Sequence, residues 1–143
     1  SNKYAQFILT QLGSKHLITK ANNNKLEHIG SDLNRLSTIN KEFCNSISNE
    51  IDWNRIINRC KKNIQFSNLA DSVCALFSYN KSLAQQLLNK FDLSYLINRA
   101  SMLEKNNLLK SLNKLNVVSK ETTKEIVKGL KKIGYIKKSR KDT

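Results

Sequence analysis

Four basic residues recur at a nearly constant spacing along this chain of 143 residues. Lys20, Arg59, Arg99 and Lys138 are separated by steps of 39 or 40 residues. If each step is one structural unit, the four cations line one edge of the molecule and can follow a phosphate backbone, each contact releasing a counterion. The alternative is that they bond the carbonyl groups at helix ends or pair with nearby acids. The basic column therefore predicts either a polyanion-binding ladder or a set of structural contacts.

Polar residues near the basic column are candidates for contacts with nucleic acid bases. Asn58 and Asn98 directly precede two of the arginines, and an amide side chain there could reach a base edge or cap a helix end. Arg35, Lys110 and Lys114 are expected at exposed positions of a neighbouring helix. We predict that these five residues contribute to nucleic acid binding, because unstacked bases of a single strand can lie against such a surface.

The overall charge also favours a polyanionic partner. The chain contains 25 lysine and arginine residues against 11 acidic residues, which gives a net charge of +14. Segment 128–141 alone holds seven basic residues and no acid. Such a surplus suits nucleic acid or an anionic membrane surface, although a basic terminal run can also be a solvated helix end.

The residues that usually perform catalysis or bind metals do not form a recognisable constellation. His16 and His28 have no cysteine or carboxylate at metal-ligand spacing, and there is no glycine-rich phosphate loop and no nucleophile elbow. Cys44 and Cys60 align with alanine in other copies of the repeat described below, so we expect packed thiols. These observations predict a noncatalytic protein with no metal, no cofactor and no small-molecule substrate.

Helices must position these side chains. Proline is absent and only four glycines occur, which excludes an architecture of many short strands and predicts an all-α protein. Residues 51–60 (IDWNRIINRC) return as residues 91–100 (FDLSYLINRA), and other segments match at the same spacing. Two kinds of amphipathic helix are expected: a short one at about 26–38, 67–79 and 104–116, and a longer one at about 3–21, 41–61, 81–101 and 120–138. The longer helix is expected to break near Asp52 and Asp92, where an aspartate can cap a new helix.

Such helices bury their apolar faces only by stacking, which predicts an α-solenoid. We expect three to four helical-hairpin repeats of 39–40 residues, with seven helices in all. The predicted domain covers residues 1–138, with units at about 1–21, 22–61, 62–101 and 102–138, and a basic tail follows at 139–143.

One repeat carries a family resemblance. Residues 66–76 (FSNLADSVCAL), followed by Leu83, Leu87 and Leu88, resemble the octotricopeptide-type repeat, also found as the leucine-rich helical repeats of RAP and FAST-kinase-like proteins. Residues 107–115 and 28–36 show the pattern more weakly. The resemblance implies modular binding of single-stranded RNA along one face of a superhelix.

Our leading expectation is thus a helical-repeat module that binds single-stranded nucleic acid, with RNA favoured, through a basic face. Two alternatives stay open: a solenoid for protein–protein interaction, and a domain of a larger secreted bacterial protein that binds phosphoinositides or anionic membranes. Three cysteines without a close pair, and the lack of an apolar run or a signal pattern, predict a reducing intracellular compartment. A secreted effector that acts inside a host cell is the second expectation for localisation.

Overall fold

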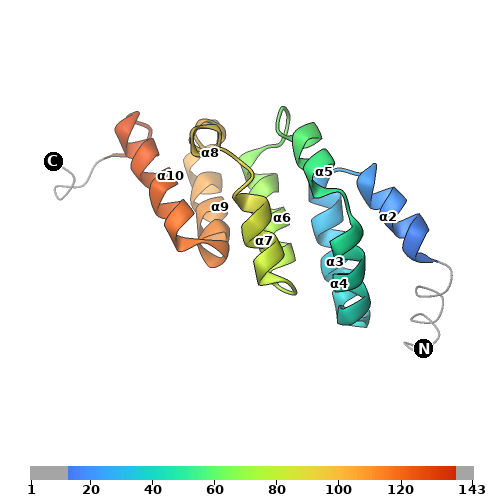
Figure 1. The fold of residues 1–143 in the computed structure, drawn as a ribbon. Coiled ribbons are helices and arrows are strands. Elements are labelled where there is room, and N and C mark those ends of the chain that lie inside the picture. The colour runs from blue at the N-terminus through green and yellow to red at the C-terminus, as the bar shows by residue number, and fades with distance from the viewer. Residues whose placement is uncertain (1–12, 138–143) are drawn as a thin grey trace.

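The computed structural model describes residues 13–137, and in this part of the chain the protein is all-α. Figure 1 shows the helices standing side by side in a row, with α2 and α10 at opposite ends. The helices are α2 (Ser14–Asn22), α3 (Leu26–Ile39), α4 (Lys41–Glu50), α5 (Trp53–Cys60), α6 (Phe66–Phe77), α7 (Lys81–Leu88), α8 (Leu93–Ala100), α9 (Lys105–Val118) and α10 (Lys120–Lys132).

The short helices expected from the sequence are confirmed as α3, α6 and α9. Each is followed directly by a helix whose N-cap side chain accepts a hydrogen bond from the third residue of that helix. These caps are Asn40 before α4, Asn80 before α7 and Ser119 before α10, with acceptor distances of 3.0 to 3.1 Å. The cap satisfies an amide that has no partner inside the helix. The chain turns within one residue at Asn40 and at Ser119, whereas three residues, 78–80, separate α6 from α7.

The longer helices expected at 41–61 and 81–101 are each two helices. The first breaks after Glu50, and the carboxylate of Asp52 accepts a hydrogen bond from the Arg55 amide at 3.1 Å to start α5. The second breaks after Leu88, and α8 starts after Asp92 without a side-chain cap. The described residues therefore form nine helices and not seven.

The helix expected at 120–138 ends early, at Lys132. Gly134 follows with a positive φ of 80°, a conformation in which a side chain is strained, and the amides of Tyr135 and Ile136 bond the Leu130 carbonyl. The last segment thus leaves the helical direction before residue 137. Of the helix expected at 3–21, residues 3–12 lie outside the described residues, as does Lys138.

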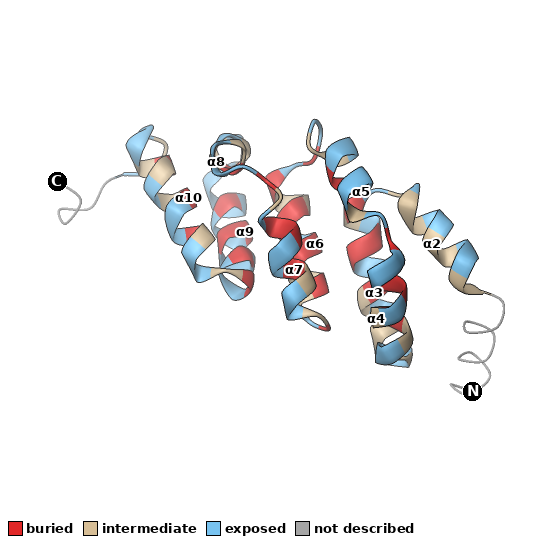
Figure 2. Cartoon of the chain, viewed as in Figure 1, coloured by how far each residue is buried: buried red, intermediate tan, exposed pale blue. Residues whose placement is uncertain are grey.

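Two layers of helices enclose the core (Figure 1). In one layer α3 packs against α6, and α6 packs against α9. In the other, α4 lies on α3, α7 on α6, and α10 on both α8 and α9. Figure 2 shows buried residues concentrated along α6 and on the inner sides of its neighbours. Apolar residues recur at matching positions of α3, α6 and α9, and all are buried apart from half-buried Leu36: Ile29, Leu69, Leu108; Leu33, Val73, Leu112; Leu76, Leu115.

The first layer is held together by a close approach of α3 to α6 at Gly30. A Cβ atom built on Gly30 would lie 3.0 Å from the Ser72 carbonyl oxygen and 3.2 Å from the Ser72 Cα. Backbone atoms cannot swing aside as a side chain can, so this contact requires a very small residue. The matching position on α6 is Ala70, which is also fully buried.

The prediction of packed thiols is confirmed. Cys44 is fully buried, and its Sγ donates to the Leu33 carbonyl at 3.1 Å. Cys60 is partly buried at the end of α5. Burial, followed by the nearby charge of Glu27, raises the pKa of Cys60 to about 11, whereas its ordinary value is 9.0.

The raised pKa of Cys60 predicts a loss of stability at alkaline pH. Between pH 9 and 11 the unfolded chain releases the thiol proton while the folded chain keeps it, so the free energy of unfolding falls as the pH rises. Cys60→Ala introduces the residue found at the aligned positions Ala21 and Ala100. We expect urea denaturation to show a shallower fall for Cys60→Ala than for the wild type above pH 9, and parallel behaviour below it. If the free energy of unfolding falls equally steeply with pH in both proteins, the Cys60 thiol is not the cause of the loss.

Candidate polyanion-binding surface

Arg59 of the basic column donates hydrogen bonds to backbone carbonyls at the end of α2 and in the loop that follows it. Its guanidinium donates to the carbonyl of Asn22 at 2.9 Å and also to the carbonyl of Asn24. Asn22 is the last residue of α2, 37 residues before Arg59, and Asn24 lies in the loop after α2, 35 residues before Arg59. Arg59 thus satisfies acceptors at a helix C-terminus, where a cation is favourable.

Arg99 makes the same contact one step further along the chain. Its guanidinium donates to the Lys62 carbonyl at 2.6 Å, and its Cζ lies 5.3 Å from the centre of the Tyr95 ring. Arg99 and Lys62 follow Arg59 and Asn22 by 40 residues each. The carbonyl-bonding alternative therefore describes both arginines, whose guanidinium groups are engaged in the junctions between successive helices.

The two lysines of the column do not extend this pattern. Lys20 is exposed on α2, and Lys138 lies outside the described residues. At the third junction the donor is Tyr135, whose hydroxyl bonds the Leu103 carbonyl, and Lys105 Nζ lies 5.9 Å from the centre of the Tyr135 ring. The basic column is therefore divided, among the described residues, between two arginines that bond backbone carbonyls at helix junctions and one exposed lysine.

The contact of Arg99 predicts an effect on folding. We expect Arg99→Ala to lower the free energy of unfolding by about 1.5 kcal/mol, because a charged hydrogen bond to a carbonyl and a cation–π contact are lost. The neighbouring substitution Asn98→Ala, at an exposed position, serves as control and is expected to change it by less than about 0.5 kcal/mol. Chemical denaturation of both variants measures the difference, and equal stabilities would show that the junction contact contributes nothing.

The other candidate residues from the sequence are exposed but lie on different helices. Asn58 is on α5 and Asn98 on α8. Arg35 forms an ion pair with Asp32 of its own helix at 2.6 Å, and Lys114 of α9 forms one with Asp71 of α6 at 2.5 Å, which raises the pKa of Lys114. These ion pairs partly neutralise the charges of Arg35 and Lys114, so each of the two residues binds an anion more weakly than an unpaired cation would.

Lys110 is the exception among the predicted residues. It is exposed on α9, and no carboxylate of the described residues lies within ion-pair distance of it. It belongs to the end of the row where α9 and α10 carry most of their charge in lysine. Together α9 and α10 contain eight lysines and two acidic residues, Glu121 and Glu125.

A stripe of lysines on α10 is the densest basic feature of this end. Lys120, Lys124, Lys128 and Lys132 follow one another at four-residue intervals, and all four are exposed. Residues four apart lie on the same side of a helix, about 6 Å apart along its axis. We call these four residues the α10 lysine stripe. Lys128 and Lys132 lie in the basic run noted in the sequence, but Lys120 and Lys124 were missed, although their four-residue spacing could have revealed them.

The lysines of the stripe repel one another. Like charges four residues apart destabilise a helix by a few tenths of a kcal/mol per pair, and Glu121 and Glu125, three residues before Lys124 and Lys128, offset part of this cost. None of the four ammonium groups lies within 4 Å of a carboxylate in the part of the chain that the structure describes. A bound polyanion would relieve this repulsion, and the exposed ammonium groups can reach it without breaking existing contacts.

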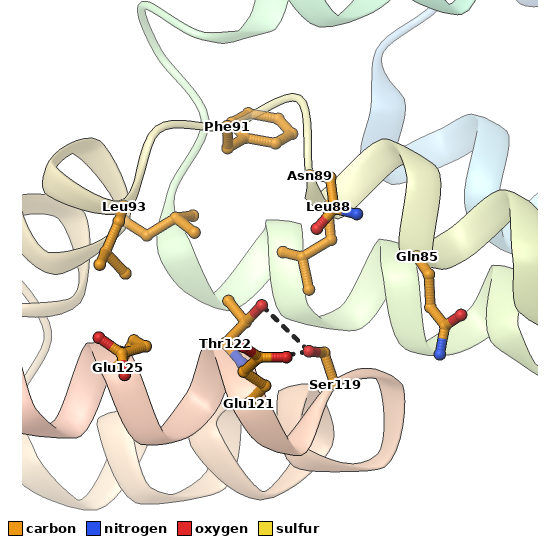
Figure 3. A pocket seen from close by; sticks show the side chains of 10 residues that line it. Gln85, Leu88, Asn89, Phe91, Leu93, Ser119, Glu121, Thr122 and Glu125 are labelled. Carbon is orange, nitrogen blue, oxygen red and sulfur yellow. Dashed lines mark hydrogen bonds between the residues drawn. The ribbon is translucent and has the colours of Figure 1, made fainter.

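A pocket of about 530 Å³ lies beside the stripe, between α10 and the helices α7 and α8. Figure 3 shows its lining, which includes Glu121 and Glu125 of α10 and Gln85 of α7, with Leu93 at the rim. The carboxylates make this pocket unsuitable for a phosphate group, because like charges repel. A polyanion on α10 therefore has to follow the lysine stripe and avoid the pocket.

The aromatic residues Trp53, Phe91 and Tyr95 contribute to packing. Phe91 is buried, Tyr95 packs against it with ring centres 5.9 Å apart, and Trp53 donates from Nε1 to the Ser48 carbonyl at 2.8 Å. All three pack in or against the core. None of them offers an exposed ring on which a base could stack.

Within residues 13–137 no three histidine, cysteine or acidic side chains are grouped so that they could hold a metal ion. In the same range no helix has the length and apolar character needed to cross a membrane. Comparison with protein-family models, with curated proteins and with solved structures finds no match for this chain.

Proposed function

We propose that this protein is a noncatalytic helical-repeat module that binds single-stranded nucleic acid, with RNA favoured, through the surface formed by α9 and α10. The observation that carries the proposal is the α10 lysine stripe, with Lys110 on the neighbouring helix. Its three steps of about 6 Å are comparable to the separation of successive phosphates in an extended strand. A single strand can adjust its backbone to such a row, which a stiff duplex does less readily.

The α-solenoid with a 39–40-residue repeat is part of this proposal. It is supported by the stacking of α3, α6 and α9 in one layer, and by the two arginine junctions 40 residues apart. Stacked units of this kind produce a continuous surface on which a linear polymer can lie. The octotricopeptide-type resemblance leads to the same class of ligand.

The proposed mechanism is electrostatic. Each lysine of the stripe that meets a phosphate displaces a counterion, so affinity falls as salt rises. For a single strand the logarithm of the affinity changes by about −0.7 per contact for each unit of log salt, which gives a slope of about −3 for four contacts. The ion pairs of Arg35 and Lys114 compete with phosphate, so these residues are secondary contacts in the proposal.

Fluorescence anisotropy of a labelled single-stranded RNA, measured at several salt concentrations, tests the proposal. We expect saturable binding with a log–log slope near −3 and release at about 0.5 M salt. Vesicles containing an anionic phosphoinositide and vesicles of neutral lipid form separate arms. Binding to anionic vesicles but not to RNA would favour the membrane alternative over this function, and the absence of binding to either would overturn a polyanion partner.

A further inference from the structure

The face of α3 that carries Asp32 and Leu36 is not covered by another described helix, whereas the matching faces of α6 and α9 are covered. On α6 this face is covered by α3, and on α9 it is covered by α6. Ser72 and Ser111 at its centre are buried, whereas Asp32 at the matching position of α3 is exposed. Leu76 and Leu115 are fully buried, whereas Leu36 is half-buried. The open face therefore has the pattern of a helix-packing surface, but no helix of the described residues lies on it.

This open face is the floor of a groove of about 420 Å³. Leu17 and Ala21 of α2 form one wall, and Leu33, Leu36 and Ile39 of α3 form the floor. Ile39 is 38% exposed and is one of six large apolar side chains that are exposed among the described residues. A groove with these apolar walls loses contact with water when a helix enters it, which is the main driving force for such docking.

The matching groove on α6 shows what kind of helix fits. There α3 presents Glu27, which accepts a hydrogen bond from Asn68 Nδ2 at 3.0 Å, and three residues later Gly30, which approaches the Ser72 backbone. The residues of the open face that match Asn68 and Ser72 are His28 and Asp32. A helix seated there in the same way therefore places an acid at His28 and a small residue at Asp32.

The charges around the groove also indicate which kind of helix can bind in it. Lys20 and Arg35 line the groove, and Asp32 is already paired with Arg35. The helices that occupy the matching positions carry net negative charge: α3 has Glu27 and Asp32 against Arg35, and α6 has Asp71 alone, so each is −1. An acidic helix also complements the protein's charge of +14.

A second copy of this chain does not meet these requirements. The free face of α9 at the other end of the row has Leu109 at the position of Gly30 and Ala70. Leu109 is 60% exposed, and a leucine is too large for a contact in which a single Cβ would already lie at 3.0 Å. Two molecules of charge +14 also repel each other.

From these observations we propose that the groove between α2 and α3 binds an amphipathic, acidic α-helix of a different protein. The helix presents an acid followed three residues later by glycine or alanine, with the acid at His28 and the small residue at Asp32. This interaction surface is separate from the α10 lysine stripe at the opposite end of the row (Figure 1). It thus goes beyond the proposed binding of nucleic acid and does not depend on it.

A peptide with the sequence of α3, residues 26–39, is the probe, because α3 is the natural occupant of the matching groove. We expect the labelled peptide to bind the full 143-residue chain saturably in fluorescence anisotropy. The same peptide with Gly30→Leu should bind at least about tenfold more weakly, since the large side chain prevents the close approach. On the protein, Ile39→Asp should also weaken binding at least about tenfold, because it places a charge in the apolar floor.

Leu109→Asp is the matched control, since it introduces the same charge at an exposed apolar residue outside the groove. It should leave peptide binding unchanged, and thermal denaturation checks that both protein variants fold. The proposal is overturned if the peptide fails to bind saturably, or if Ile39→Asp leaves binding unchanged. It is equally overturned if deletion of residues 1–12 creates binding that the full chain lacks, or if sedimentation reveals a dimer that Ile39→Asp dissociates.

Discussion

Replacing Lys124 and Lys128 by glutamate is expected to weaken binding of single-stranded RNA by more than about tenfold at ~0.1 M salt. Both residues are in the middle of the α10 lysine stripe and are exposed, so the substitutions remove two phosphate contacts and add two repulsive charges without disturbing the core. The slope of log affinity against log salt should fall from about −3 to about −1.5. Anisotropy titrations of the wild type and the variant measure both quantities.

The matched control is Lys15→Glu with Lys41→Glu. It makes the same change in net charge at two exposed positions on α2 and α4, at the other end of the row. We expect less than about a threefold loss of affinity from this variant, because charges beyond a Debye length of about 10 Å are screened. If both variants lose affinity equally, the attraction comes from net charge alone and the stripe is not a site.

The second large effect is expected from Gly30→Leu, which should lower the free energy of unfolding by more than about 2 kcal/mol. Leucine has the better helix propensity by about 1 kcal/mol, so local structure alone predicts the opposite sign. The loss arises because the new side chain meets the Ser72 backbone and forces α3 away from α6. Urea denaturation monitored by circular dichroism provides the measurement.

Leu109→Ala is the control for this prediction. Leu109 occupies the aligned position on α9, where it is 60% exposed, and the substitution should change stability by less than about 0.5 kcal/mol. A protein that tolerates Gly30→Leu as well would show that the first layer of helices can separate at little cost. The stacking of α3 on α6, and with it the argument for the groove on α3, would then need revision.

The two arginine junctions change how the basic repeat is understood. Residues that recur at a constant spacing in the sequence can occupy similar environments, and such an environment can be a junction between helices as readily as a binding face. Arg59 and Arg99 bond carbonyls 37 residues before them, so they connect successive parts of the stack. The proposed binding surface instead uses lysines that share a single helix.

The helices themselves could be predicted from the sequence because the signals are local. Apolar residues at helical spacing, and N-cap residues such as Asn40, Asn80 and Ser119, act within one or two turns. The breaks near Asp52 and Asp92 were also predicted, although only Asp52 caps the new helix with its side chain. The early end of α10 at Lys132 was not predicted, since Gly134 had no counterpart in the other copies of the repeat.

The sequence by itself determined the all-α class, the apolar helix faces that form the core and the surplus of positive charge. Only the tertiary structure decided which charges are available, because a side chain's partners come from residues distant in sequence. Arg59 and Arg99 meet carbonyls of an earlier segment, and Lys114 meets Asp71, whereas no lysine of the α10 lysine stripe has a carboxylate within ion-pair distance in the described part of the chain. The open face of α3 likewise became visible only when the covered faces of α6 and α9 could be compared with it.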